Sequence, residues 1–499
     1  MIDRKSLLLA GVSTAVGLLG CEIGLRMVAP AGLGGASAIP KIAAAAGSAS
    51  LENAAAYIAR MDAVPGTDRR WFLEDPEPLK RGPVDPAVMA RYLEFERRGL
   101  YSSSAQYVFN RLFVAQMGCL PNGVFRGFPD RVMAFDAPGH TEHPRFRFPP
   151  DMTMPDGLVT NRFGLRGPRI SLEKPVRTIR VAFAGASTTV NTHAFRFSYP
   201  EYTVHWLNRF AQANGMDVHF EVLNAGREGI GSFDISAIVR EELVPLNPDL
   251  VVYYEGANQF YPQQFIDPPM FRRAALDPKD AVALHKVPEW LRTHSAIGER
   301  IDRLLSGAFA VGEPAKPSYR VRWPKGVDEF HPDPDNPNLA MNLTLIVRDL
   351  DAIRDALRPI GGELAVASFE RLAVDRMRLS PVAHEGIYRE LNTTLWPLRY
   401  ADIRRIADFQ NRVFRAYADS RRIPFLDIAG HVPQDPALFT DSVHMTEVGE
   451  RLKAWIFFQQ LVPYFRRQIE SGRLPQTIHP PLPPPPSLAA FEIQVCPGR

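Results

Sequence analysis

From residue 179 onward, short apolar runs alternate with segments of helical periodicity, and this alternation restricts the fold more than any other feature of the sequence. The expected strands are 179–184, 218–223, 250–254, 364–368 and 424–428. The expected helices are 202–212, 234–243, 343–357, 403–417 and 447–467. Apolar runs separated by helices are typical of a parallel sheet that is covered on both faces. The sequence therefore predicts an α/β domain with a five-stranded parallel sheet.

The first apolar run ends in a cluster of small residues, Gly185-Ala186-Ser187-Thr188-Thr189. A serine at the end of a buried strand, on the turn into a helix, is where an α/β fold can present a nucleophile. The free N–H groups and the dipole of the next helix favour developing negative charge there. The alternative is an ordinary strand-to-helix turn in which Ser or Thr caps the helix.

Three further segments carry polar residues directly after an expected strand or before the last expected helix. They are Asn224-Ala225-Gly226, Glu255-Gly256-Ala257-Asn258-Gln259 and Asp441-Ser442-Val443-His444. The last segment is followed by Thr446, which we expect to cap the final helix. An Asp and a His three residues apart can place the carboxylate on one imidazole nitrogen and leave the other nitrogen free.

Charge and cysteine content exclude several classes of protein. The chain of 499 residues has 58 basic and 55 acidic side chains, a net charge of +3, which gives no argument for a nucleic-acid partner. Three cysteines, at 21, 119 and 496, cannot build a disulfide framework, although one bond between 119 and 496 stays open for an exported protein. No Cys/His cluster predicts a metal or a cofactor, and His140 with His143 is best explained by a surface loop.

The N-terminus has the build of an export signal or a membrane anchor. Arg4 and Lys5 precede an apolar stretch, and residues 18–21 resemble a lipobox with Cys21 as the residue to be lipidated. The alternatives are an uncleaved membrane helix over 6–26 and, ranked third, a buried helix of a cytoplasmic protein. Both export readings place the body of the protein outside the cytoplasm, in the periplasm or elsewhere in the cell envelope.

The remaining segments divide as follows: 1–26 signal or anchor, 27–155 linker and N-terminal extension, 156–465 main domain, and 466–499 a proline-rich tail. Within the main domain, residues 261–338 break the strand and helix alternation and are interpreted as a long insertion after the third strand. Loops beyond the carboxyl ends of parallel strands border the ligand crevice, so the insertion is expected to be a lid or specificity element.

The four polar segments resemble, in order and strand position, the blocks of the SGNH hydrolases, also called GDSL-type esterases. The segment 161–167, Asn-Arg-Phe-Gly-Leu-Arg-Gly, also resembles the lead-in of membrane-anchored, exported members. The resemblance covers about 156–465 and implies a flavodoxin-like three-layer fold. It implies Ser187 as nucleophile, His444 as general base and Asp441 as its support. The oxyanion hole implied is made of the N–H groups of Ser187 and Gly226 and the side chain of Asn258, and no cofactor is needed.

Two positions depart from the family pattern: Ala186 stands in place of the Asp before the serine, and Gln259 in place of the Asp after the asparagine. Neither position is the nucleophile, the base or an oxyanion donor, so rate and substrate preference are put in doubt more than reaction class. An α/β-hydrolase elbow would require Gly where Thr189 stands. Arg227, next to the oxyanion glycine, is interpreted either as a substrate contact or as half of a structural ion pair.

The sequence thus predicts a serine esterase that removes O-acyl groups, with O-acetyl esters of envelope or extracellular glycans as the expected substrates. The glycan part of this prediction rests on family analogy. Two alternatives stay open. One is an O-acetyltransferase that uses the same site, and the other is a catalytically weak glycan-binding or scaffolding protein. The sequence makes no prediction of the oligomeric state.

Overall fold

The computed structural model describes residues 50–79, 148, 150–151, 153, 158–191, 196–267, 310–381, 383–476 and 481–485. The expected anchor over 6–26, the three cysteines and the histidines at 140 and 143 lie outside these ranges. No helix within the ranges is long and apolar enough to cross a membrane.

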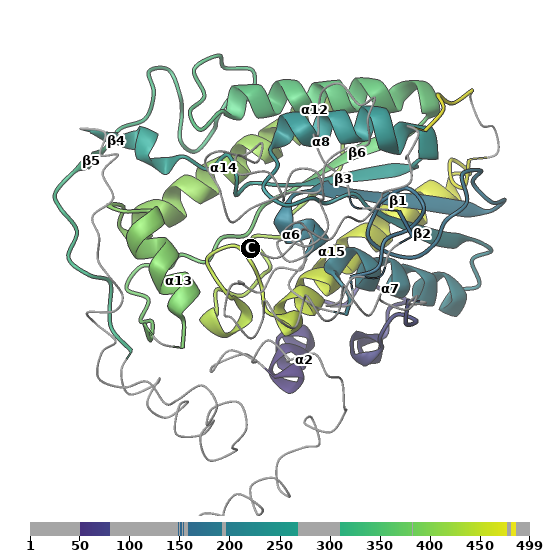
Figure 1. The fold of residues 1–499 in the computed structure, drawn as a ribbon, viewed down its shortest axis with the longest axis horizontal. Coiled ribbons are helices and arrows are strands. Elements are labelled where there is room, and N and C mark those ends of the chain that lie inside the picture. The colour runs from purple at the N-terminus through teal and green to yellow at the C-terminus, as the bar shows by residue number, and fades with distance from the viewer. Residues whose placement is uncertain are drawn as a thin grey trace, which may run out of the picture.

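A five-stranded parallel sheet forms the centre of the domain, in the order β2-β1-β3-β6-β7 (Figure 1). The strands are β1 (Thr178–Gly185), β2 (His219–Asn224), β3 (Leu250–Tyr254), β6 (Glu363–Ala367) and β7 (Phe425–Leu426). The predicted flavodoxin-like sheet is confirmed. Because β1 lies between β2 and β3, the chain reverses its direction of travel across the sheet beside β1, and a crevice opens at the carboxyl ends of strands at such a point.

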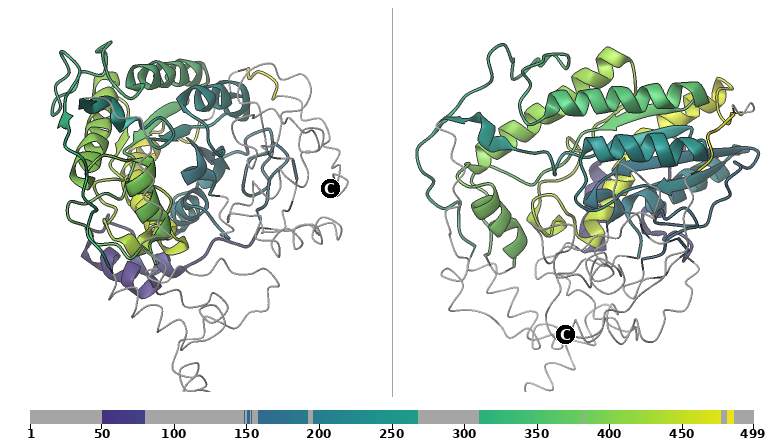
Figure 2. Two further views of the ribbon diagram at one scale, coloured as in Figure 1. Left: turned by 60° about the vertical axis from the view of Figure 1, so that its left-hand side comes forward. Right: turned by 45° about the horizontal axis from the view of Figure 1, so that its top comes forward.

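Helices cover both faces of the sheet, as the two views of Figure 2 also show. One face carries α7 (Tyr199–Ala213) and α15 (Glu447–Glu470), and the other carries α8 (Ser232–Ile238), α12 (Leu343–Leu357) and α14 (Tyr400–Arg421). A one-turn helix, α6 (Ser187–Val190), follows β1 directly. Thr446 caps α15 as expected, since its hydroxyl accepts the N–H of Gly449.

Two predicted elements differ from the structure. The segment expected as one helix over 234–243 is α8 followed by a π-helical turn, η2 (Val239–Leu243). The last strand, expected over 424–428, is only two residues long. The chain leaves the sheet after Leu426 because the Asp427 N–H donates to the side chain of Gln460, at 2.6 Å, rather than to a neighbouring strand.

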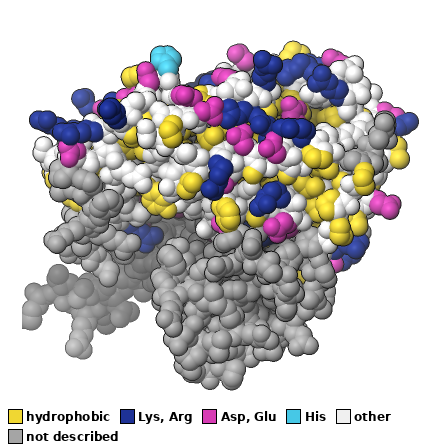
Figure 3. Space-filling view, turned by 90° about the horizontal axis from the view of Figure 1, so that it is seen from above, with side chains coloured by type: hydrophobic (Ala, Val, Ile, Leu, Met, Phe, Trp, Pro, Cys, Tyr) yellow, Lys and Arg dark blue, Asp and Glu magenta, His cyan; other side chains and the backbone are white. Residues whose placement is uncertain are grey.

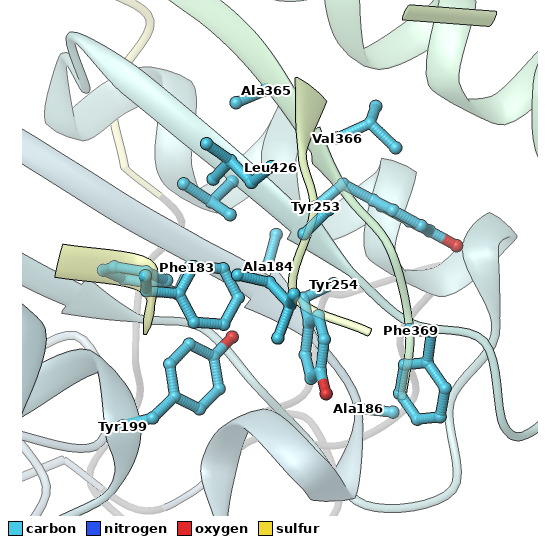
Figure 4. Close-up of a cluster of buried hydrophobic side chains, with 14 of the residues drawn as sticks. Phe183, Ala184, Ala186, Tyr199, Tyr253, Tyr254, Ala365, Val366, Phe369 and Leu426 are labelled. Atoms are coloured by element: carbon cyan, nitrogen blue, oxygen red, sulfur yellow. The ribbon is translucent and has the colours of Figure 1, made fainter. Parts of the chain in front are cut away.

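Aromatic side chains fill the space between the sheet and α15 (Figure 4). Tyr199 stacks on Phe457 with ring centroids 4.7 Å apart, and Phe183 of β1 meets Tyr199 edge-on at 5.4 Å. Tyr254 at the end of β3 also packs against Tyr199. Such rings bury large apolar areas in defined orientations. The carboxyl end of β1 is therefore supported by closely packed aromatic rings.

The described part of the N-terminal extension packs on the outside of α15. It consists of α2 (Leu51–Arg60) and the turn η1 (Arg69–Leu73). Phe72 is buried against Trp206 and Trp455, and the indole N–H of Trp206 donates to the carbonyl of Trp71 at 2.7 Å. Burial of these rings joins the extension to the main domain.

Between β3 and α12 the chain makes a small two-stranded antiparallel sheet from β4 (Ile266–Asp267) and β5 (Arg320–Val321). After β6 come the short helix α13 (Glu385–Arg389) and the π-helical turn η6 (Glu390–Thr394). The remaining short turns are η3 (Val244–Leu246), η4 (Pro262–Phe265), η5 (Arg358–Ile360) and η7 (Pro436–Leu438).

The face seen in Figure 3 carries basic and acidic side chains side by side, without a single-sign patch over the described residues. On α12 and the turn that follows it, for example, Arg354 pairs with Asp351 and Arg358 with Asp355. This mixture matches the near-balance of charge in the sequence.

Candidate active site

Ser187 stands just after the carboxyl end of β1, where close packing leaves no room for side chains. A Cβ added to Gly185 would lie 2.3 Å from the carbonyl oxygen of Tyr254 and 2.1 Å from the hydroxyl of Thr189. The strand can therefore end this close to β3 only with glycine at that position. α6 begins at Ser187 itself, so the N–H of Ser187 has no acceptor inside its own helix.

The structure brings Ser187, His444 and Asp441 into one hydrogen-bonded chain. The Ser187 Oγ lies 2.8 Å from Nε2 of His444, and Nδ1 of the same ring lies 2.7 Å from Oδ2 of Asp441. The second carboxylate oxygen of Asp441 accepts the N–H groups of Val443 and His444, at 2.9 and 2.7 Å. The three-residue spacing in the sequence thus fixes the imidazole by its Nδ1 side and turns Nε2 toward the serine.

Electrostatic interactions among the three hydrogen-bonded side chains favour an ion pair between the His444 imidazolium and the Asp441 carboxylate. Burial by itself would raise the pKa of Asp441, but the pKa lies below its usual range because His444 and the two N–H donors outweigh burial. Burial would lower the pKa of His444, yet the Asp441 carboxylate, aided by Glu228 and Glu390, raises it to about 9. The neutral imidazole that can accept a proton therefore becomes the main form only at alkaline pH.

Two side chains that sequence reasoning did not single out, the buried Arg371 and the partly exposed Glu390, hold the loop of Asp441. Glu390 accepts the N–H of Ser442 at 2.8 Å, and Arg371 donates to the hydroxyl of Ser442 at 3.1 Å. The guanidinium of Arg371 also lies 4.0 Å from the ring centroid of Phe260. Neither residue stands in a recognisable motif, so no signal in the sequence marks them.

Asn258 lies in the loop that follows β3. Its side-chain nitrogen donates to the carbonyl of Ile230 at 2.8 Å, which uses one of its two N–H groups. The loop is shaped by Glu255, whose Oε1 accepts the N–H groups of Ala257 and Asn258 at 2.8 and 2.6 Å. Burial raises the pKa of Glu255 to about 7, although these two hydrogen bonds lower it. The sequence placed Glu255 beside the motif but did not predict this role.

Gly226 lies against α6, since a Cβ added to it would lie 2.4 Å from the backbone nitrogen of Val190. Its N–H donates to Oδ1 of Asn224 at 3.1 Å. An oxyanion would therefore have to share or displace this bond before Gly226 could act as a donor. The N–H of Ser187 and the second N–H of the Asn258 amide carry no such requirement.

The two positions that depart from the pattern of the resembled family, Ala186 and Gln259, are both part of the packed structure. Ala186 is fully buried. Gln259 accepts the N–H of Ser232 at 2.6 Å and so binds the start of α8. Arg227 is buried in an ion pair with Glu242. The structure thus shows the ion pair considered for Arg227 from the sequence.

Within the described ranges, no group of three or more His, Cys, Asp and Glu side chains is placed to hold a metal ion.

No family model matches the sequence, and a search of curated proteins finds no match. Solved structures similar to this chain include the acetylxylan esterase of Geobacillus stearothermophilus, at 15% identity and a TM-score of 0.30, covering 57% of this chain and 94% of that one. A lipase/acylhydrolase of Enterococcus faecalis matches at 14% identity and 0.30, covering 57% and 96%. A GDSL-like lipase of Bacteroides thetaiotaomicron matches at 14% and 0.28, covering 61% and 93%.

Proposed function

We propose that this protein is a serine ester hydrolase of the SGNH type that works through an acyl-serine intermediate. The observation that carries the proposal is the continuous chain of hydrogen bonds from Ser187 through His444 to Asp441 at the carboxyl edge of the sheet. These three side chains come from segments that the sequence resemblance had already singled out. The nucleophile, the base and the support of the base are each within hydrogen-bond reach of the next.

In the first half-reaction, Ser187 Oγ attacks the ester carbonyl carbon while its proton passes to Nε2 of His444. The carbonyl oxygen becomes an oxyanion, to which the N–H of Ser187 and the amide of Asn258 can donate. Each such donor typically stabilises the transition state by about 3 kcal/mol. Asp441 stabilises the imidazolium that forms. His444 then gives the proton to the leaving alcohol oxygen as the ester C–O bond breaks, which leaves the acyl group on Ser187.

In the second half-reaction, His444 takes a proton from a water molecule that attacks the acyl-serine carbonyl. Collapse of the tetrahedral intermediate breaks the bond to Ser187 Oγ, and His444 returns the proton to that oxygen. The products are a carboxylic acid and the free enzyme. A sugar hydroxyl in place of water would make the same site an acetyltransferase, so the acceptor decides between the two activities.

For the substrate we propose O-acetyl esters of envelope or extracellular glycans. The support is the resemblance of the four motif segments to the family and of the segment 161–167 to its exported members. We propose likewise that residues 6–26 direct export and attach the protein to the membrane. The intact mass of membrane-extracted protein tests the mode of attachment. Loss of the first 20 residues together with a lipid mass supports Cys21 as the anchor, and full length supports a membrane helix.

The deciding experiment measures p-nitrophenyl acetate hydrolysis and fluorophosphonate labelling by the full chain in detergent. Ser187→Ala and His444→Ala are expected to abolish turnover, and the label is expected on Ser187. His431→Ala and Ser420→Ala are matched controls outside the hydrogen-bonded chain and should keep wild-type rates. If folded wild type neither labels nor turns over, the esterase proposal fails and a glycan-binding or scaffolding role takes its place. If acyl transfer to an added oligosaccharide outpaces hydrolysis, the protein is a transferase.

A further inference from the structure

The helix that presents Ser187 is a single turn, α6, from Ser187 to Val190. Inside it, the carbonyl of Ser187 accepts the N–H of Asn191 at 2.8 Å. The last four carbonyls of a helix receive no hydrogen bond from an N–H group of the same helix. In a helix of one turn, almost every carbonyl is of this kind. Isolated turns are also unstable, because nucleation costs more than one hydrogen bond returns. The nucleophile therefore depends on groups outside α6 for its position.

Side chains from three distant segments bind four consecutive carbonyls at the carboxyl end of this turn. Lys453 of α15 donates to the carbonyl of Thr188 at 3.3 Å. Asn224 of β2 donates to that of Thr189 at 3.1 Å. Arg166, from the segment 161–167, donates to the carbonyls of Val190 and Asn191, at 3.0 and 2.5 Å. Together Lys453, Asn224 and Arg166 form what we call the carbonyl clamp.

Two members of the carbonyl clamp are buried cations, and buried cations are costly unless they are paired. Lys453 is fully buried, with Glu450 at 2.7 Å and Glu370 at 3.6 Å from its Nζ. Arg166 is buried beside Glu201, at 3.5 Å. Positive charge at the carboxyl end of a helix complements the helix dipole. The sign and position of both charges thus suit the binding of this turn.

We propose that Lys453 and Arg166 are positioning residues for the reaction of Ser187. By holding the carboxyl end of α6, they keep the Ser187 Oγ within reach of His444 Nε2 and aim the Ser187 N–H at the developing oxyanion. The proposal rests on the proposed esterase function. It also gives the segment 161–167 a physical role, because Arg166 in that segment binds the carbonyls of Val190 and Asn191.

The competing explanation is that these cations only stabilise the fold. A matched control distinguishes the two. Lys174 is also buried and pairs with Asp249 at 2.8 Å, but it lies at the amino end of the sheet, away from Ser187. Removing either lysine should cost stability, whereas only Lys453 should affect the serine.

The experiment compares Arg166→Met, Arg166→Lys, Lys453→Met and Lys174→Met in the full chain. The double variant Lys453→Met/Glu450→Gln removes the charge pair together and covers the case in which Lys453→Met alone does not fold. Measurements are kcat, KM, the fluorophosphonate labelling rate and Tm. For Arg166→Met and for the double variant we expect kcat and labelling to fall about 100-fold, because a displacement of about 1 Å has that effect. KM should change by less than about threefold.

Arg166→Lys keeps the charge and one donor and should recover part of the loss. Lys174→Met should lower Tm but keep kcat within about twofold of wild type. If folded Arg166→Met and the double variant also keep kcat and labelling within that range, the positioning role is wrong and the clamp is structural only.

A readout independent of turnover separates this proposal from the proposed function. The imidazole ¹⁵N resonances of His444, assigned with His444→Ala, report its hydrogen bond to Ser187 at fixed pH. They should shift in Arg166→Met and not in Lys174→Met. If wild type proves inactive but this pattern holds, the carbonyl clamp stands and the esterase function fails. If the resonances of Arg166→Met match those of wild type, the clamp does not position Ser187.

Discussion

A lysine is buried beside carboxylates at each end of the parallel sheet, but the hydrogen bonds between lysine and carboxylate differ between the two ends. At the amino end, Asp249 receives Lys174 on one oxygen at 2.8 Å and the N–H of Arg180 on the other at 2.7 Å. At the carboxyl end, Lys453 bonds Glu450 at 2.7 Å, while its 3.6 Å approach to Glu370 is an ion pair too long for a hydrogen bond. Among the described residues, neither carboxylate oxygen of Glu370 has a hydrogen-bond partner.

This difference shows where in the fold the protein accepts a cost in stability. A buried polar atom without a partner typically costs about 1–3 kcal/mol. At the amino end both carboxylate oxygens of Asp249 are satisfied, as stability requires. At the carboxyl end one oxygen each of Glu255 and Glu450 is also unpartnered within the described ranges. Buried carboxylate oxygens without hydrogen-bond partners thus occur at the end of the sheet that presents Ser187. This is the pattern expected when a site is built at the expense of stability.

The largest expected effect comes from an Asp→Asn exchange made at each end of the sheet. Asp441→Asn should lower kcat about 10⁴-fold, because the amide can no longer hold the reactive tautomer of His444. Asp249→Asn should leave kcat nearly unchanged and lower the free energy of unfolding, because the buried Lys174 then loses the carboxylate that is hydrogen-bonded to it. Steady-state kinetics and urea unfolding of both variants test this. Equal kinetic losses would erase the functional difference between the two ends.

A smaller kinetic effect is expected at the oxyanion loop. Asn258→Ala should reduce kcat about 10²–10³-fold with little change in KM, because the lost donor acts mainly in the transition state. Gln259→Ala is the neighbouring control, since its side chain binds the N–H of Ser232 instead. A loss in Gln259→Ala as large as that in Asn258→Ala would show that loop shape, and not the amide donor, is what matters.

The unpartnered carboxylate predicts a pH-dependent stability. Burial raises the pKa of Glu370 to about 7, against an ordinary value of 4.5, although Lys453 opposes the shift. Because the folded pKa is the higher one, the stabilising contribution is complete below pH 4.5 and is lost as the pH rises through 7. Glu370→Gln does not titrate. Its unfolding free energy should therefore increase relative to that of wild type by about 2–3 kcal/mol between pH 5 and pH 8.

Urea unfolding at the two pH values measures that gain, and Glu470→Gln, at the exposed last residue of α15, is the control. A difference between Glu370→Gln and wild type that is the same at both pH values would contradict the assigned cause.

The smallest effect concerns the pH profile of activity. The pKa of His444 is about 9, and the neutral ring is the base, so kcat/KM should rise with pH from 7, reach half its maximum near 9 and level off above that. The gain over this range should be about tenfold or more. Residual activity of Asp441→Asn should level off at lower pH, since the carboxylate that raises the pKa is gone. Stopped-flow acylation across this range checks both, and a profile flat above pH 7 would contradict the prediction.

Local sequence was sufficient to predict most of the secondary structure and to single out the motif residues. Apolar periodicity depends only on neighbours along the chain, and strand 250–254 and helix 343–357 lie where that pattern placed them. The Asp441 to His444 contact is also local, because both residues lie on one turn. The anchor over 6–26 and the choice of glycan esters stay predictions, since nothing in the described residues tests them.

Tertiary structure alone decided what surrounds the motif. Ser187 and His444 are 257 positions apart, and only the packing of α15 against the sheet brings them together. The same packing delivers Lys453 to the carbonyl of Thr188, and the pairing of β1 with β2 places Asn224 where it donates to the carbonyl of Thr189. Contacts between distant segments follow from strand order and helix packing, which leave no period in the sequence. A motif therefore shows which residues could react, and the fold decides which groups hold them in place.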